Sequence, residues 1–222
     1  MDQRTIRFLR ALKRNNRKEW FDAHREEYEQ AVKLPARQWV SEIRPLLIGL
    51  SPHLEVSPRS IYRINRDTRF SEDKTPYKTW LGFLFWDRRF QKEQAPGYYF
   101  GIDPTGFALG AGIYRFHSLQ RAVFRERLVD EFSGQSFAAA IKPIQRARFE
   151  LKGCELKKIP QGYDPEHPLA DYLRHNGLYS SKEFDFPSSF GTARFARDVV
   201  RCLEPCAPLM TWLGEHLRMR DS

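Results

Sequence analysis

The feature that most restricts the fold is a series of short β-type segments in the middle of the chain. Runs of β-branched, aromatic and small residues occupy positions 60–66, 79–87, 97–103 and 107–115. The sequence Asp103-Pro104-Thr105-Gly106 provides a turn between the last two runs. Connections as short as these favour antiparallel pairing, because a parallel crossover needs a dozen or more residues. The series therefore predicts an antiparallel meander, and the almost wholly apolar run Trp80–Trp86 predicts a central strand covered on both faces.

Helical spacing flanks this central region on both sides. Apolar residues between Thr5 and Lys33 recur at three- and four-residue steps with a break at Asn15-Asn16, which predicts two amphipathic helices. Further helices are expected over 35–47, 119–132, 164–173, 192–203 and 208–217, a short strand or hairpin over 149–159, and a helix stop at Asn176-Gly177. The predicted fold class is α+β. Residues 1–222 are expected to form a single domain, an antiparallel meander sheet flanked by N-terminal and C-terminal helices.

Charge and composition restrict the class of partner without identifying it. The 222 residues include 37 Lys and Arg against 28 Asp and Glu, a formal net charge of +9. The positive surplus is spread over 1–34, 59–78 and 142–158 rather than gathered in a basic arm. This pattern is compatible with an anionic partner and also with ordinary solvated faces.

The chain is expected to be cytoplasmic and to have no membrane partner. It contains no run of about 20 apolar residues, and charges occupy the N-terminal positions where a signal peptide needs an apolar run. Its 3 cysteines suit a reducing compartment. No metal site is expected, because the 6 histidines form no H-x-H or H-x-x-x-H pair and no zinc spacing occurs. A P-loop, a dinucleotide fingerprint and a nucleophile elbow are also lacking, so no cofactor is assigned.

The densest group of charged residues is the segment Arg63–Lys78, which we call the signature segment. If the chain stays extended through Arg69, a two-residue period brings several guanidinium groups to one face. The planar guanidinium fork matches carboxylate and phosphate oxygens, so this face could hold an anionic ligand. The alternative is an ion-pair network in which Asp67 and Asp73 occupy the forks and fix the loop. The candidate ligand-binding residues are Arg63, Arg66, Asp67, Arg69, Asp73, Lys74, Tyr77 and Lys78.

The string R-x-x-R-D-x-R-F-x-x-D-K-x-P-Y, from Arg63 to Tyr77, resembles the signature of a bacterial family, domain of unknown function 2461. The stretches Phe8-Leu9 through Asn15-Asn16, Glu19-Trp20-Phe21, 109–114 and 162–168 resemble the same family in order, so the resemblance spans nearly the whole chain. It implies a single-domain, mostly bacterial protein. It provides no catalytic residues that could be transferred to this chain.

A second feature is the small-residue face of the run 107–115. Ala108, Gly110 and Gly112 alternate along it and present almost no side chain. Glycine in a strand marks close approach by another group. That group could be a ligand lying on the sheet, or an aromatic side chain or helix packing into the gap.

Three functions follow from these observations. The first is an enzyme or ligand-binding domain for a small molecule that carries a phosphate or carboxylate, with its site in the signature segment. The second is a nucleic-acid-binding module, suggested by net charge but supported by no motif. The third is a structural or interaction protein without catalysis. The sequence leaves the reaction, the cofactor and the oligomeric state unassigned.

Overall fold

The computed structural model describes residues 1–218. The helices and helical turns of the N-terminal part are α1 (Gln3–Arg14), α2 (Lys18–Ala23), α3 (Arg25–Tyr28), the π-helical turn η1 (Glu29–Lys33), α4 (Leu34–Leu50) and the 3-10 turn η2 (Pro58–Ser60). Those of the remaining part are η3 (Lys92–Gln94), α5 (Ser118–Val129), α6 (Glu131–Arg146), η4 (Ala170–Arg174), α7 (Arg194–Leu203), η5 (Glu204–Cys206) and α8 (Ala207–His216). The strands are β1 (Leu54–Glu55), β2 (Leu81–Asp87), β3 (Gly97–Ile102), β4 (Phe107–Ile113), β5 (Glu150–Cys154) and β6 (His175–Phe184).

The strands form one antiparallel sheet in the order β1-β2-β3-β4-β6-β5. The strands β2, β3 and β4 correspond to the last three of the four predicted runs and pair as consecutive neighbours, because the connections between them are too short for a parallel crossover. The strand β1, which pairs with β2, was not predicted. The predicted α+β class and antiparallel sheet with helices at both ends are therefore confirmed.

The chain divides into two compact units. The first consists of Met1–Phe85, Tyr99–Leu109 and Glu183–Cys202, and the second of Trp86–Tyr98, Gly110–Lys182 and the residues from Leu203 onward. The prediction of one domain over 1–222 stays a prediction.

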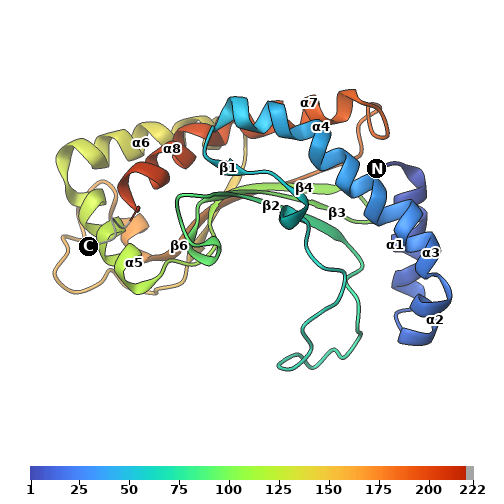
Figure 1. The fold of residues 1–222 in the computed structure, drawn as a ribbon. Coiled ribbons are helices and arrows are strands. Elements are labelled where there is room, and N and C mark those ends of the chain that lie inside the picture. Colours follow the sequence, from blue (N-terminus) through green and yellow to red (C-terminus); the bar gives the residue numbers. More distant parts are fainter. Residues whose placement is uncertain (219–222) are drawn as a thin grey trace. The chain divides into compact units, whose positions relative to one another are not determined.

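In the first unit, α4 covers one face of β2 and β3 (Figure 1). The indole ring of Trp39 on α4 lies 4.9 Å from the ring of Phe83 and 4.5 Å from that of Phe100, measured between centroids. Phe195 on α7 joins this cluster at 6.0 Å from Phe100. All four side chains are buried. The odd-numbered residues of β2 and the even-numbered residues of β3 therefore face α4, which leaves Gly82, Tyr99 and Gly101 on the opposite face.

The second unit has its own aromatic core. Phe124 on α5, Phe137 on α6 and Trp212 on α8 are buried against one another, with centroid distances of 5.0–5.9 Å. The indole N–H of Trp212 donates to the carbonyl oxygen of Ser133 at 3.0 Å, so this buried donor is satisfied. Gly112 on β4 has a φ of +136° and lies directly against the backbone of β6. The group that approaches this glycine is thus a neighbouring strand.

Several element predictions were wrong. The run 60–66 forms only isolated bridges, Ile61 to Phe83 and Asn65 to Tyr77, because the signature segment leaves the sheet after η2. Asn176-Gly177 lies inside β6 and ends no helix, and the helix expected over 164–173 is reduced to the 3-10 turn η4. The strand β2 is an interior strand, second from the edge of the sheet, and its residues are buried on both faces as predicted. The sequence analysis also missed α6 beyond Phe132 and the whole of β6.

Over residues 1–218, no helix combines the length and the apolar character that crossing a membrane requires.

Candidate functional site

The signature segment forms a long loop that leaves the sheet after η2 and returns at the start of β2 (Figure 1). Its two limbs are hydrogen-bonded to each other. The amide of Arg66 donates to the carbonyl oxygen of Pro76 at 2.9 Å, and the amide of Lys78 donates to that of Ile64 at 2.7 Å. The segment therefore reverses direction between Arg66 and Pro76, with a turn at Arg69-Phe70, and does not form one extended strand through Arg69.

Carboxylates of the loop already occupy two of its guanidinium forks. Arg69 donates to both carboxylate oxygens of Asp67, at 3.0 Å from Nε and 2.7 Å from Nη2. Arg66 donates from Nη1 to the carboxylate of Asp73 and to the hydroxyl of Thr75. These pairs fit the ion-pair network that the sequence analysis kept as an alternative. They fix the shape of the loop.

The two carboxylates are held ionised. The side-chain hydrogen bonds from Arg69, and then its backbone N–H, lower the pKa of Asp67 to about 2. The backbone N–H of Thr75, and then the side chain of Arg66, lower the pKa of Asp73 to about 2. Both depressed values belong to the folded loop, so the corresponding stabilisation is present above the ordinary pKa of 3.8 and is lost as the pH falls toward 2.

This linkage predicts a local response to acid. In a carboxyl-carbon NMR titration, we expect Asp67 to titrate with a midpoint near 2, and Arg69→Gln to move that midpoint toward 3.8, because the variant loses the fork that favours the carboxylate. Arg44→Gln removes an exposed guanidinium from α4 and serves as the control that leaves the midpoint unchanged. A wild-type midpoint near 4 would show that the Asp67–Arg69 pair does not form in solution.

The returning limb of the loop is anchored to the N-terminal helices. Asn16 lies in the break between α1 and α2, and its side-chain amide donates to the carbonyl oxygen of Tyr77 at 2.8 Å. The backbone N–H of Tyr77 donates to Oδ1 of Asn16 at 3.1 Å. The ring of Tyr77 is buried and stacks on Phe21 with a centroid distance of 4.2 Å. These contacts place the adjacent Lys78.

Lys78 is held in place by backbone carbonyl groups and aromatic rings. Its ammonium donates to the carbonyl oxygens of Arg63 at 2.7 Å and Asn65 at 3.0 Å. It also lies 5.9 Å from the ring centroid of Tyr62 and 5.7 Å from that of Trp80. Partial burial, and then the charges of Arg63 and Arg66, lower the pKa of Lys78. Since an ammonium has three donors, one N–H remains after the two carbonyl contacts.

Lys78 lines a pocket of about 410 Å³, which we call the basic pocket. Its cations are Lys13, Arg66 and Lys78, and Asp73 is the carboxylate among its lining residues. The lining is completed by Asn16, Thr75, Tyr77, Thr79 and Trp80. Since Asp73 is already paired with Arg66, the pocket presents two further positive charges.

The structure thus brings together only part of the predicted set. Arg66, Asp73, Tyr77 and Lys78 line the basic pocket, and Arg63 lies close enough to affect the charge of Lys78. The other three predicted residues lie outside the lining: Asp67 and Arg69 pair with each other, and Lys74 donates to the carbonyl oxygen of Thr68 at 3.0 Å. Lys13 and Asn16 were missed, because they lie far from the loop in sequence and no local motif marks them.

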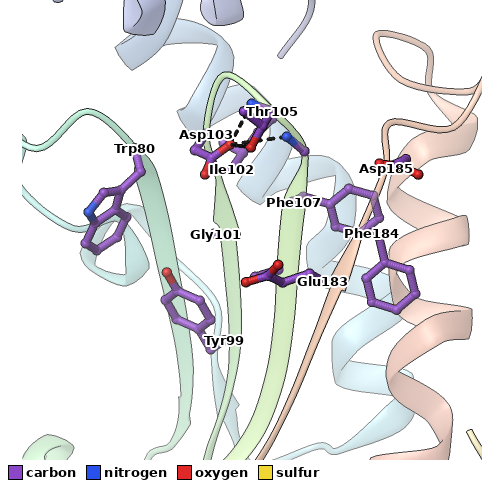
Figure 2. Close-up of a pocket in the computed structure, with 12 residues that line it drawn as sticks. Trp80, Tyr99, Gly101, Ile102, Asp103, Thr105, Phe107, Glu183, Phe184 and Asp185 are labelled. Carbon is purple, nitrogen blue, oxygen red and sulfur yellow. Dashed lines mark hydrogen bonds between the residues drawn. The ribbon is translucent and has the colours of Figure 1, made fainter. Parts of the chain in front are cut away.

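A second pocket, of about 450 Å³, lies on the face of β3 and β4 opposite α4 (Figure 2). Figure 2 shows Trp80, Tyr99 and Glu183 around it, with the Asp103–Thr105 turn at one end. Asp103 is fixed in that turn by accepting from the backbone N–H of Thr105 at 2.6 Å. Burial raises the pKa of Tyr99 to about 12, so its hydroxyl remains protonated at neutral pH. Trp80 lines both pockets.

Within residues 1–218, no group of three or more His, Cys, Asp or Glu side chains is placed to hold a metal ion. The groups that line the two pockets and could contact a ligand are therefore cations, aromatic rings and single carboxylates.

The fold and the pockets define an α+β protein with an antiparallel sheet and a pocket lined by Lys13, Arg66 and Lys78 beside its signature loop. Residues 4–212 match the family model described as conserved hypothetical protein (DUF2461), and the chain belongs to this family. A search of curated proteins found no match to the chain.

Proposed function

We propose that the protein binds a small molecule bearing a phosphate or carboxylate group in the basic pocket, with Lys78 as the principal ligand of the anion. The observation that carries this proposal is the convergence of Lys13, Arg66 and Lys78 on one pocket, in which Asp73, the one carboxylate among the lining residues that the structure describes, is already paired. Carboxylate and phosphate oxygens accept charge-assisted hydrogen bonds from such groups. Arg63 lies near Lys78, and its guanidinium has no hydrogen-bond or ion-pair partner among residues 1–218. It can therefore donate further hydrogen bonds to the anion.

The pKa of Lys78 supports the same assignment. Burial and the charges of Arg63 and Arg66 disfavour the charged form of Lys78. A bound anion would offset part of this unfavourable electrostatic free energy. The protein therefore holds a partly desolvated positive charge at a position where an anion offsets it. The two carbonyl contacts keep the ammonium in place before a ligand arrives, which limits the entropy lost on binding.

A titration with simple anions tests the proposal. Binding of inorganic phosphate, pyrophosphate and citrate is measured calorimetrically for wild type, Lys78→Gln and Lys13→Gln. We expect Lys78→Gln to weaken the tightest of these anions by about 10- to 100-fold, because a charge-assisted hydrogen bond is removed. Lys13→Gln loses a cation that holds no loop contact and is expected to weaken binding less.

Lys18→Gln is the matched control, since it removes an exposed lysine from α2, outside the basic pocket. It should leave the affinity unchanged. Thermal unfolding of each variant checks that the fold is kept. The proposal fails if none of the three anions binds to wild type, or if Lys78→Gln folds and binds them as tightly as wild type does.

A further inference from the structure

The face of the sheet opposite α4 carries three aromatic rings in mutual contact, which we call the aromatic plate: Tyr62, Trp80 and Tyr99. The centroid of Trp80 lies 5.9 Å from that of Tyr62 and 6.5 Å from that of Tyr99. Tyr62 and Tyr99 are 6.4 Å apart, so each ring touches the other two. All three side chains are only partly buried, so the plate retains accessible surface.

Glycines beneath the plate allow the rings to lie flat on the strands. A Cβ at Gly82 would overlap the benzo ring of Trp80 and lie 2.7 Å from Cδ2 of Tyr62. A Cβ at Gly101 would overlap the hydroxyl of Tyr99 and lie 2.8 Å from its ring carbon Cζ. The rings therefore occupy the space that side chains of β2 and β3 would otherwise fill. Figure 2 shows Trp80 and Tyr99 on the same side of these strands.

Opposite charges lie at the two ends of the plate. The ammonium of Lys78 is 5.7 Å from the Trp80 centroid and belongs to the basic pocket. Glu183 lines the pocket that Trp80 and Tyr99 share. Its carboxylate is exposed and has no hydrogen-bond or ion-pair partner among the described residues. A ligand lying on Trp80 thus meets a cation at one end and an acceptor of N–H or O–H groups at the other.

We infer that the anionic ligand is a nucleotide, with its phosphate at Lys78, its base stacked on Trp80 and N–H groups of the base donating to Glu183. This inference rests on the proposed function and specifies its substrate class. A nucleobase offers a planar face that stacks on an aromatic ring and polar edges that a carboxylate can read. A sugar phosphate without a base would leave the aromatic plate unused.

The test compares a phosphate ligand that carries a base with phosphate ligands that lack one. Calorimetric affinities are measured for guanosine monophosphate, ribose 5-phosphate and inorganic phosphate at one salt concentration. We expect guanosine monophosphate to bind about 10- to 100-fold more tightly than ribose 5-phosphate, because only the nucleotide stacks. Trp80→Leu should remove most of this preference, so that the ratio of the guanosine monophosphate affinity to the ribose 5-phosphate affinity falls close to 1. Tyr114→Leu, which removes an aromatic ring that is 76% exposed and outside the plate, should change neither affinity.

A second variant keeps the test valid if Trp80→Leu does not fold. Trp80→Phe keeps a ring for stacking, so it should retain the nucleotide preference. It should also lose the quenching of tryptophan fluorescence that guanosine monophosphate causes in wild type. The remaining tryptophans provide an internal reference for this signal.

The outcomes separate the two proposals. Equal affinities for guanosine monophosphate and ribose 5-phosphate would overturn the nucleotide assignment and leave the anion site standing. Absence of binding by all three phosphates would overturn both. Tighter binding of a short oligonucleotide, with an affinity that falls steeply with salt, would replace the mononucleotide by a nucleic acid.

Discussion

Replacing Gly112 by alanine is expected to lower the free energy of unfolding by about 3 to 5 kcal/mol. Gly112 has a φ of +136°, a backbone conformation that a residue with a Cβ rarely adopts. An added Cβ would overlap the carbonyl oxygen of Leu178 and lie 2.6 Å from Cα of Tyr179. Both are backbone atoms of β6, so no side-chain rotation can relieve the overlap. The loss corresponds to a decrease of roughly 10 °C in the thermal midpoint.

Gly49→Ala provides the matched control. Gly49 lies in α4, and a Cβ there would meet no atom within 4 Å. Since alanine favours a helix over glycine by about 0.5–1 kcal/mol, this variant should be neutral or slightly more stable. Urea unfolding of both variants measures the difference. Equal stabilities for Gly112→Ala and wild type would mean that β4 and β6 do not pair closely at this position.

Replacing Phe100 by alanine is expected to cost about 3 to 5 kcal/mol of stability, through lost burial and the cavity left behind. Phe100 is 0% exposed and lies at the centre of the core of the first unit. Its ring centroid is 4.5 Å from Trp39, 5.5 Å from Phe83, 5.9 Å from Phe107 and 6.0 Å from Phe195. These partners come from α4, two strands and α7, so the site cannot easily collapse around the cavity.

The same substitution at Phe70 tests whether burial is the cause. Phe70 is 96% exposed in the signature segment, and the guanidinium carbon of Arg69 lies 5.7 Å from its ring centroid. Phe70→Ala should change the free energy of unfolding by less than about 0.5 kcal/mol. Chemical unfolding of the two variants side by side gives the comparison. Similar losses at both positions would contradict the assignment of Phe100 to the core.

The meander was predictable because its signals are local. The strands β2, β3 and β4 combine apolar runs with short connections, and the residues from Asp103 to Gly106 form the expected turn. The strand β6 was not predictable, since Asn176-Gly177 is typical of a helix stop and nothing local shows that Gly177 lies against the backbone of Tyr114. Tertiary contact overrides the turn preference there.

In the candidate site, too, the residues with a local sequence signal were predictable and those brought in by tertiary contacts were not. The sequence marks Arg66, Asp73, Tyr77 and Lys78 through their shared segment, and they line one pocket. It does not mark Glu183, which is brought beside Trp80 only when β6 joins the sheet. The glycines of β2 and β3 were the available signal, because Gly82 and Gly101 each have an aromatic residue two positions before them along the same face, at Trp80 and Tyr99.

The pair of hydrogen bonds between Asn16 and Tyr77 couples the basic pocket to the N-terminal helices. One amide side chain both donates to and accepts from the backbone of Tyr77, as a neighbouring strand would. The side chain of Asn16, at the junction of α1 and α2, therefore replaces the hydrogen bonds that a neighbouring strand would make to Tyr77. When this junction unfolds locally, the limb that carries Lys78 loses both hydrogen bonds to Asn16 and keeps only those to the outgoing limb of the loop. Amide hydrogen exchange at Tyr77 should thus report the opening free energy of the N-terminal helices, as expected if these helices and the basic pocket unfold locally as one cooperative unit.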